Sequence, residues 1–341
     1  MEEKRILGFC STPDFSGNAK ALYEQLKERK LKNYELIWIV RDDKMKKRLE
    51  EIGVDVVCST DSDFEKKFRK IQIMFITHDE FIKKKLPTQT FISLWHGFGP
   101  KRAGLLTRGR TIYENESNFA KQYGKKLDYL ITPSELALMV FNAIYDCGVE
   151  KIKVFPYNRN RYLFENHAET INKIIDRKME DFDKVILYAP TFRKDHDKKF
   201  LEKDFKKIIS ACEKRFGGEF VLLNRDHNFT LKNDGKKYNA DKIYECNTIE
   251  DVQILLYSCD VIITDYSSLM WDAAFSKHPC FLYIYDIDDY LKTWGFHTDF
   301  NKLPYPCAKT IDDFCNKILN FDNEKYKQDL QKMQVSGLKC L

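Results

Sequence analysis

The sequence predicts an α/β protein made of two Rossmann-like, doubly wound domains that face each other across a cleft. Apolar runs rich in Ile, Val, Phe and Leu recur between amphipathic stretches, which is the alternation expected of βαβ units around a parallel sheet. The chain has 341 residues, 43% of them hydrophobic. Because single hydrophobic cores stop growing near about 250–300 residues, two domains are favoured over one.

The first half of the chain shows this alternation from its start. We expect strands at residues 5–9, 36–40, 54–58, 71–76, 90–94 and 129–132, with helices such as 19–29 and 134–145 between them. In the second of these helices, Leu136, Val140 and Ile144 form one apolar stripe. Ser134, which follows Pro133, is a typical helix-start signal.

A charged, helix-prone stretch at residues 165–183 separates this half from a second series of strands and helices. We therefore expect an N-terminal domain at 1–164 and a C-terminal domain at 165–341. The second series has expected strands at 185–188, 220–223, 259–264 and 280–283, expected helices at 200–215, 249–257 and 268–275, and a closing Lys-rich helical segment at 311–333.

Charge, cysteine usage and missing motifs exclude several classes of protein. The net charge of +5 is too small to indicate nucleic-acid binding, although it would suit an anionic membrane face or substrate if concentrated on one side. The ten cysteines form no C-x-x-C pair, so neither a zinc site nor a disulfide framework is predicted, and a reducing cytosol fits best. No H-E-x-x-H, P-loop, G-x-G-x-x-G or G-x-S-x-G motif is present, and no window approaches the roughly 18 apolar residues of a spanning helix. We expect a soluble or peripheral protein with no metal and no tightly bound cofactor.

A histidine flanked by tryptophan and glycine follows the strand expected at 90–94. Ligands of doubly wound domains bind at the carboxyl ends of strands, so Trp95, His96 and Gly97 are expected to line the cleft. Histidine titrates near neutrality and would act as a base, while the glycine lets a phosphate approach the backbone. The alternative is that His96 only caps the strand by hydrogen bonding.

Hydroxyl residues follow the strand expected at 259–264 and open a helix. Thr264, Asp265, Ser267 and Ser268 are candidates for binding a pyrophosphate, because helix N-terminal N–H groups and the positive end of the helix dipole attract phosphate. The alternative, which is compatible with the first, is that one serine is only an N-cap.

Two further loops of the second half would line the same rim. Pro190, Thr191 and Arg193 follow its first expected strand, and His227 follows its second. Arg193 would hold a phosphate and His227 would donate a hydrogen bond to it, stabilising charge on the group in transfer. Isolated arginines and histidines in loops are more often solvated, which is the alternative.

A short basic segment comes soon after His96. It contains Lys101, Arg102 and Arg108 with two leucines, and it would contact an anionic acceptor or a lipid head group. The alternative is a flexible, solvated loop. The remaining histidines considered have no ligand-like spacing, so surface or structural roles are expected for His78, His167, His196 and His278.

Taken together, these segments resemble the CDP-glycerol glycerophosphotransferase family, whose members build poly(glycerol phosphate) teichoic acids and related capsules. The similar segments are residues 95–97, 128–134, 188–193 and 260–268, together with Gly295, Phe296 and Asp299. Residues 98–101 and 156–161 depart from the family pattern, as does the segment around His227. The likeness extends from about the first strand to Pro306.

The resemblance implies a GT-B fold and the transfer of glycerol phosphate from CDP-glycerol to the terminal hydroxyl of a growing chain, with release of CMP. It implies His96 as the base, His227 as a donor-site residue, and Ser267 and Ser268 as ligands of the donor phosphates. The implied partners are CDP-glycerol or CDP-ribitol, an anionic polyol-phosphate or lipid-linked glycan acceptor, and the inner face of the cytoplasmic membrane, where a cytoplasmic protein would bind peripherally. Two alternatives stay open, namely a GT-B nucleotide-sugar glycosyltransferase and a catalytically inactive nucleotide-binding subunit.

Overall fold

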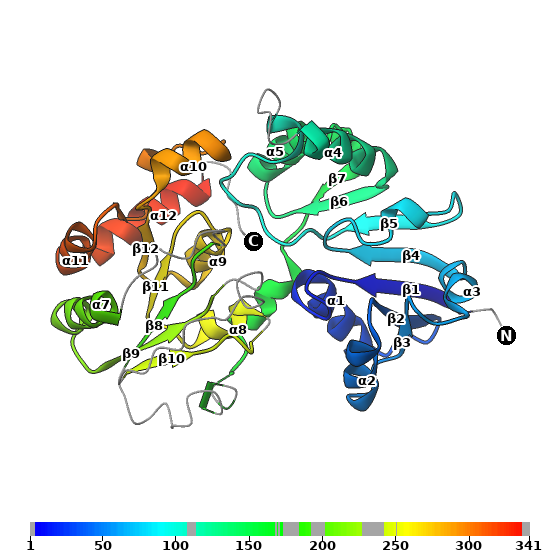
Figure 1. The fold of residues 1–341 in the computed structure, drawn as a ribbon, viewed down its shortest axis with the longest axis horizontal. Coiled ribbons are helices and arrows are strands. Elements are labelled where there is room, and N and C mark those ends of the chain that lie inside the picture. The colour runs from blue at the N-terminus through cyan, green and yellow to red at the C-terminus, as the bar shows by residue number, and fades with distance from the viewer. Residues whose placement is uncertain are drawn as a thin grey trace. The chain divides into compact units, whose positions relative to one another are not determined.

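The computed structural model describes residues 4–107, 114–167, 169, 171–172, 184–191, 202–226, 242–249 and 251–335. The chain divides into two compact units, which are considered one at a time (Figure 1). Of the described residues, unit 1 holds those within Met1–His96 and Ala103–Arg161, and unit 2 those within Gly97–Arg102 and Tyr162–Gly337. Within the described residues, the chain leaves unit 1 for the last time after Arg161, a few residues before the domain boundary expected after residue 164. The short segment Gly97–Arg102 also belongs to unit 2.

Unit 1 is built on a parallel sheet, which has seven strands among the described residues in the order β3-β2-β1-β4-β5-β6-β7. The strands are β1 (Arg5–Cys10), β2 (Tyr34–Val40), β3 (Val56–Cys58), β4 (Ile71–Ile76), β5 (Thr90–Ser93), β6 (Tyr129–Thr132) and β7 (Ile152–Val154). The helices are α1 (Gly17–Glu28), α2 (Asp43–Glu51), α3 (Phe64–Phe68), α4 (Glu114–Lys126) and α5 (Glu135–Tyr145). The order is that of a Rossmann fold, whose topological switch point falls between β1 and β4.

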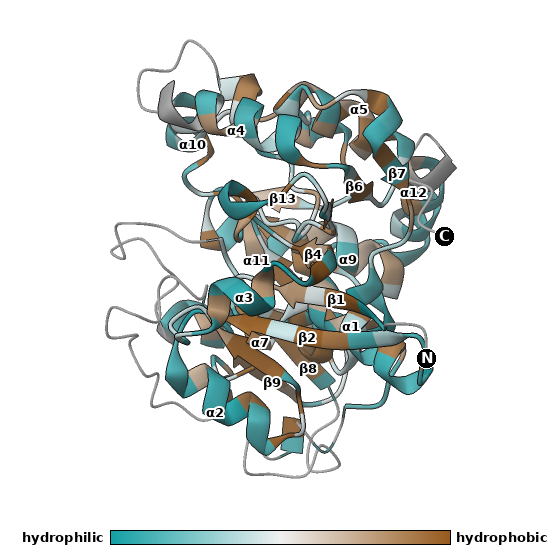
Figure 2. Cartoon of the chain, turned by 90° about the vertical axis from the view of Figure 1, so that its right-hand side faces the viewer, coloured by the Kyte–Doolittle hydropathy of each residue, from teal (hydrophilic) through white to brown (hydrophobic). Residues whose placement is uncertain are grey.

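The sequence folds this way because the central strands are apolar on both faces. Phe9 of β1 is fully buried, and its ring lies 6.1 Å from Trp38 of β2, 5.4 Å from Tyr23 of α1 and 5.1 Å from Phe75 of β4. A strand covered by helices on both sides requires such a continuous apolar run. Figure 2 shows the contrast, with brown residues along β2 and mainly teal residues on α2.

Unit 2 repeats the architecture with a parallel sheet in the order β10-β9-β8-β11-β12-β13, six strands within the described ranges. The strands are β8 (Lys184–Tyr188), β9 (Phe220–Asn224), β10 (Ile243–Glu245), β11 (Val261–Thr264), β12 (Cys280–Tyr283) and β13 (Cys307–Ala308). The helices are α7 (Glu202–Phe216), α8 (Val252–Tyr257), α9 (Leu269–Ser276), α10 (Ile287–Thr293), α11 (Ile311–Leu319) and α12 (Asn323–Val335). This is again the Rossmann order, so the switch point of unit 2 lies between β8 and β11.

The predicted fold class is confirmed, since each unit is a doubly wound parallel α/β sheet of the kind that makes up a GT-B fold. The strands and helices expected from the sequence are present, with ends that differ by at most three residues where both ends are described. The closing segment at 311–333 is not one helix, because α11 ends at Leu319 and α12 begins at Asn323. None of the helices in the described ranges is long and apolar enough to cross a membrane.

Candidate active site

The turn after β5 holds Trp95 in a left-handed backbone conformation, with a φ of 53°. This conformation is unfavourable for a bulky side chain, and such strain is concentrated at functional sites. The indole ring lies 5.6 Å from the ring of Phe141 and 5.3 Å from that of Tyr145, both on α5. His96, the next residue, is exposed. The turn therefore presents an imidazole at the carboxyl end of β5, where the sequence predicts a base.

Two buried polar side chains hold this turn. Asn18 of α1 donates from Nδ2 to the carbonyl oxygens of Leu94 (3.0 Å) and Trp95 (2.8 Å). Arg159 donates from Nη1 to the carbonyl oxygen of His96 (2.5 Å), and its backbone N–H donates to Asn18 Oδ1 (3.2 Å). Arg159 belongs to the segment that departs from the family pattern. The backbone of the turn from Leu94 to His96 is thus held by two residues that the sequence analysis did not single out.

A second histidine lies against the first. The rings of His78 and His96 are stacked, with centroids 3.9 Å apart and planes inclined by 4°. The expectation of a surface or structural role for His78 missed this contact, because the pairing depends on two parallel strands ending side by side and not on spacing along the chain. A signal was available: His78, like His96, comes two or three residues after a buried strand, and ligand sites gather at such ends.

The hydrogen bonds of His96 identify the nitrogen that can act as a base. Nδ1 lies 3.3 Å from the carbonyl oxygen of Thr77. A carbonyl oxygen only accepts hydrogen bonds, so Nδ1 carries the proton in this contact. In the neutral ring the lone pair is then on Nε2, which is the atom that can take a proton from a substrate hydroxyl.

The carboxylate of Glu80 lies beside His78, and its side chain is completely buried. It accepts hydrogen bonds from Thr12 Oγ1 (2.9 Å), Thr77 Oγ1 (3.1 Å) and the backbone N–H of His78 (2.6 Å). Burial alone would raise the pKa of Glu80, but the hydrogen bonds and positive charge provided by His78 lower it below its usual value. Glu80 is therefore a buried anion next to the histidine pair.

A cation and a second acid complete this group, which we call the imidazole cluster: His78, His96, Glu80, Arg41 and Asp14. Arg41 donates from Nη2 to Thr12 Oγ1 (2.8 Å), lies 3.8 Å from Glu80 Oε1, and places Nη1 3.6 Å from Asp14 Oδ1. Burial raises the pKa of Asp14 to about 6, against the lowering effect of Arg41. The cluster gathers at the carboxyl ends of β1, β2, β4 and β5, around the switch point of unit 1.

In unit 2, the turn between β11 and α9 carries the hydroxyl residues predicted to bind phosphate. Ser267 and Ser268 are partly exposed. Ser267 Oγ accepts from the backbone N–H of Leu269 (3.2 Å), the first residue of α9, although the N-cap residue itself is Ser268. Ser268 makes no side-chain cap bond. Both hydroxyls lie at the amino end of α9, where the dipole and N–H groups favour an anion.

Two neighbouring residues of this turn support it from inside. Thr264 is fully buried and its hydroxyl donates to the carbonyl oxygen of Ala189 (2.7 Å). Asp265 is 2% exposed, and its Oδ1 accepts from the Thr191 N–H (2.9 Å), the Thr191 hydroxyl (2.5 Å) and the Tyr266 N–H (2.6 Å). Burial and these partners favour a supporting role for the two side chains over the direct phosphate contact that the sequence predicts. The bonds join the loop of Pro190 and Thr191 to the turn, across the switch point of unit 2.

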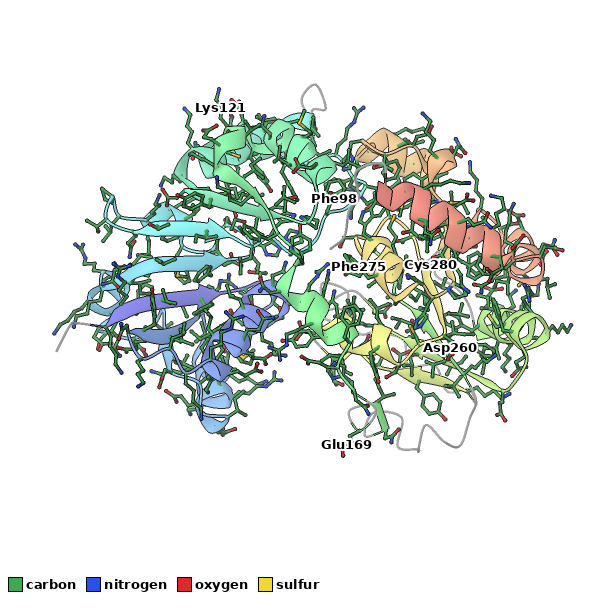
Figure 3. The ribbon with its side chains drawn as sticks, turned by 180° about the vertical axis from the view of Figure 1, so that it is seen from behind. Phe98, Lys121, Glu169, Asp260, Phe275 and Cys280 are labelled. Atoms are coloured by element: carbon green, nitrogen blue, oxygen red, sulfur yellow. The ribbon has the colours of Figure 1, made fainter. Side chains whose placement is uncertain are left out.

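The segment Gly97–Arg102, which we call the strap, follows His96 and is bound within unit 2. Phe98, labelled in Figure 3, is buried and its ring lies 6.1 Å from Trp271 of α9 and 5.3 Å from His297. His297 Nε2 lies 2.7 Å from the carbonyl oxygen of Gly99, and burial lowers the pKa of this histidine. The strap is thereby anchored close to α9, the helix that follows the turn predicted to bind phosphate.

The two basic residues of the strap have partners in the same unit. Lys101 pairs with Phe296 in an antiparallel bridge and points Nζ at the hydroxyl of Tyr290 (3.4 Å). Arg102 donates from Nε to the carbonyl oxygen of Phe296 (3.2 Å). Part of each side chain therefore serves the attachment of the strap, and contact with an acceptor or membrane stays a prediction. Arg108, Arg193, His227 and His196 lie outside the described residues.

Within the described ranges, no group of three or more His, Cys, Asp or Glu side chains is arranged to hold a metal ion. The chemistry offered by the described residues is proton transfer at His96 and anion binding at the amino end of α9.

Comparison with known proteins identifies close relatives. A family model described as CDP-Glycerol:Poly(glycerophosphate) glycerophosphotransferase matches residues 1–337. The chain is 29% identical to a teichoic acid poly(glycerol phosphate) polymerase of Bacillus spizizenii, over 96% of the chain and 85% of that protein. It is 30% identical to a teichoic acid glycerol-phosphate transferase of Staphylococcus aureus, over 96% of the chain and 89% of that protein.

Among solved structures, the wall teichoic acid polymerase TagF is similar in fold. Its TM-score to this chain is 0.76 at 24% sequence identity, and the match covers 97% of the chain and 84% of TagF.

Proposed function

The chain belongs to the CDP-glycerol:poly(glycerophosphate) glycerophosphotransferase family, and from this premise we propose that it transfers glycerol phosphate from CDP-glycerol to the terminal hydroxyl of a teichoic-acid-like polymer, releasing CMP. The observation that carries the proposal is the exposed His96 on a strained, doubly anchored turn in a chain that matches the family over nearly its whole length.

His96 is the general base of the proposed reaction. Nε2 takes the proton of the acceptor hydroxyl while the acceptor oxygen forms a bond to the phosphorus that bears the polyol. The bond between that phosphorus and the oxygen of the CMP phosphate breaks, and CMP leaves with the electron pair. The exposure of His96 leaves room for a hydroxyl to approach, and the hydrogen bonds to the Leu94, Trp95 and His96 carbonyl oxygens hold the backbone that carries the ring.

The donor phosphates bind in unit 2, at Ser267, Ser268 and the first turn of α9. The helix dipole and N–H groups provide the positive end, and Asp265 holds the supporting loops in position. Arg193 and His227 are proposed to spread the charge that develops on the transferred group. The division into a donor-binding C-terminal domain and an acceptor-binding N-terminal domain is part of this proposal.

The acceptor and the location are proposed on chemical grounds. A growing polyol-phosphate chain or a lipid-linked glycan is anionic, and Lys101, Arg102 and Arg108 belong to a basic segment close to His96 in sequence. A lipid-linked acceptor would bring the protein to the inner face of the cytoplasmic membrane as a peripheral protein. CDP-ribitol is the second donor to be tested, because the polyol is not distinguished by the residues named.

A donor and product assay tests the function. Purified protein is incubated with a lipid-linked acceptor and CDP-glycerol, CDP-ribitol or a UDP-sugar, and the released nucleotide and product length are measured. We expect CMP release with CDP-glycerol. Turnover of a UDP-sugar alone would favour a nucleotide-sugar glycosyltransferase, and binding without turnover of any donor would favour an inactive nucleotide-binding subunit.

The same assay tests the base. General-base help is typically worth about 10²–10⁴-fold, so His96→Ala should lower the rate of CMP release by about that factor. Its thermal unfolding should match the parent because His96 is exposed. His167→Ala is the histidine control, since His167 contacts the carbonyl oxygen of Tyr162 and the ring of Tyr257 in unit 2. Unchanged CMP release by His96→Ala would remove His96 from this role.

A further inference from the structure

A groove on the surface of unit 2 collects lysine side chains. It lies between α7 and α11, which pack side by side (Figure 1). Its volume is about 470 Å³, and the residues that line it include Lys203, Lys206, Lys207, Lys214, Ser210 and Asp312. Asp312 is the one acid among the described lining residues, and it lies 3.0 Å from Lys207 Nζ. The groove, which we call the lysine groove, therefore carries a net positive charge.

Three of these lysines form a stripe along one face of α7. Lys203 and Lys207 are four residues apart, and Lys207 and Lys214 are seven apart with Ser210 between them, so each step is close to a whole number of helical turns. All three lysines are exposed. With the rise of an α-helix, the stripe is about 16 Å long, so a single phosphate would occupy only part of it.

The described acidic side chains of α7 do not neutralise the stripe. Glu213 Oε1 lies 3.0 Å from Lys242 Nζ and accepts from the backbone N–H of Phe220 (3.3 Å), so this carboxylate is directed at the starts of β9 and β10. Asp204 is half-buried, and neither of these two acids lines the groove. The positive charge is therefore available to a ligand.

The stripe begins at the edge of the sheet where the donor phosphates are proposed to bind. The ring of Phe205, in the first turn of α7, lies 5.3 Å from that of Tyr188 at the carboxyl end of β8. At the other end, Lys184 Nζ, at the start of β8, donates to the carbonyl oxygen of Phe216, the last residue of α7 (2.6 Å). Helix α7 therefore runs antiparallel to β8, and the stripe leads from the carboxyl edge of the sheet toward the opposite edge.

We propose that the lysine groove binds a segment of the polyol-phosphate chain that the enzyme extends. Each repeat of such a chain carries one phosphodiester charge, so phosphates along it pair with successive lysines of the stripe, and Ser210 offers a hydroxyl between them. A membrane surface fits the groove less well, because a helix that binds a bilayer needs a broad apolar face and the large exposed apolar side chain among the described lining residues is Leu319. The identity of the polymer rests on the proposed function, whereas its binding requires no turnover.

Amine labelling locates the binding site in the unaltered protein. Purified poly(glycerol phosphate) without lipid is added to the full chain, surface lysines are acetylated, and each site is measured by mass spectrometry. We expect the polymer to slow acetylation of Lys203, Lys206 and Lys214 and to leave Lys277 and Lys332, exposed lysines of unit 2 outside the groove, unchanged. Absence of protection in the groove at a polymer concentration that saturates binding would overturn the proposal.

A triple variant tests the contribution of the groove to affinity. Lys203→Gln, Lys206→Gln and Lys214→Gln are combined, and Lys207 is kept because it pairs with Asp312. Because three exposed ion pairs with phosphate are lost, the dissociation constant for the polymer should rise by roughly 3- to 150-fold. Binding by the unaltered protein should also weaken with added salt.

The matched control removes the same charge elsewhere in unit 2. Lys277→Gln, Lys327→Gln and Lys332→Gln, combined, should leave polymer binding unchanged, because these exposed lysines do not line the groove. Equal weakening by the two triple variants would mean that binding follows total charge, which contradicts the proposal. Inorganic phosphate and phosphatidylglycerol vesicles are the comparison ligands. A groove variant that keeps polymer binding but loses vesicle binding would make the groove a membrane site.

Product length connects the groove to the reaction. With an acceptor of one repeat, the groove variant should release CMP at the initial rate of the parent, since its lysines lie outside the residues proposed to act, but it should make shorter chains. Products of parental length would overturn the proposal, because the chain being extended would then not use the groove. Polymer binding in the groove without any CMP release by the unaltered protein would refute the proposed function alone. Normal CMP release without polymer binding would refute the groove alone.

Discussion

Trp95 occupies a backbone conformation that costs a non-glycine residue on the order of 1–3 kcal/mol, and the protein keeps it. The cost is offset by ring contacts with α5 and by Asn18, whose amide donates to the carbonyl oxygens of Leu94 and Trp95, one on each side of the Trp95 Cα. A glycine here would relieve the strain but remove those contacts. His96, the next residue, is exposed, so the strained backbone at Trp95 places one imidazole at the surface.

Asp14 should make stability depend on pH in an unusual direction for an acid. Burial raises its pKa from 3.8 to about 6, so the folded protein holds this proton more tightly than the unfolded chain does. The resulting stabilisation is complete below the unfolded pKa and is lost as the pH rises through about 6. Asp14→Asn should therefore be more stable than the parent at pH above about 7, by roughly 1–2 kcal/mol after allowance for solvent screening, and nearly equal to it at about pH 4.

Urea unfolding of both proteins at these two pH values checks this prediction. Loss of the Arg41 contact in the variant would lower its stability at both pH values. The informative quantity is therefore how far the difference in free energy of unfolding between the variant and the parent changes with pH. A difference that does not vary with pH would contradict it.

The sequence analysis singled out His96 and the serine pair as candidates because each follows an apolar strand and carries a residue type suited to the proposed chemistry. It did not identify His78, Glu80, Asn18 or Arg159. Their importance comes from contacts between segments far apart in the chain, such as Asn18 with Trp95 and Arg159 with His96. Thr264 and Asp265 share the motif of Ser267 and Ser268, and only burial separates the residues that support the turn from those at its surface.

At the scale of helices and strands, α4 and α5 approach so closely that Gly124 has no room for a side chain. A Cβ added there would lie 2.2 Å from the carbonyl oxygen of Tyr145. Alanine would gain about 1 kcal/mol of helix propensity. Because the obstacle is backbone, the helices must shift, and the clash should outweigh that gain. We expect Gly124→Ala to destabilise the protein by about 1–3 kcal/mol, measured by chemical unfolding.

Gly99→Ala is the matched control for Gly124→Ala. A Cβ at Gly99 would meet nothing within 4 Å, so its effect should stay within about 0.5 kcal/mol. Equal effects of the two substitutions would show that close packing at Gly124 is not the cause.

The sequence predicted most of the described strands, and the three that it missed are short edge strands. β1, β4 and β9 are apolar over most of their length and were expected within a residue of their ends. β7, β10 and β13 were missed. Each has two or three residues and lies at the edge of its sheet, so neither apolar content nor alternation distinguishes it from a loop.

For the whole molecule, the described chain crosses between the units at three places: after His96, after Arg102 and after Arg161. The boundary expected from composition, after residue 164, lies a few residues beyond the last of these. It cannot find the first two, because a six-residue strap with two glycines and a proline looks like an ordinary loop. Phe98 is the residue that assigns the strap to unit 2, through its contacts with Trp271 and His297. His96, the proposed base, and Gly97, the next residue in the chain, thus belong to different units.

Measuring where the donor binds therefore tests the proposed assignment of donor binding to unit 2 and acceptor binding to unit 1. If CDP-glycerol binds at the amino end of α9, hydrogen exchange should slow at the backbone N–H groups of residues 265–270 and in the loop of Thr191, which Asp265 ties to that turn. At 100 times the dissociation constant, the ligand stabilises the bound state by about 2.7 kcal/mol, which limits any slowing to roughly 100-fold. The strands of unit 1 should exchange at their original rates. Ser267→Ala combined with Ser268→Ala should weaken the protection, whereas Ser276→Ala, at the other end of α9, should leave it unchanged. Protection confined to β1–β7 would place the donor in unit 1 and reverse the proposed roles of the two units.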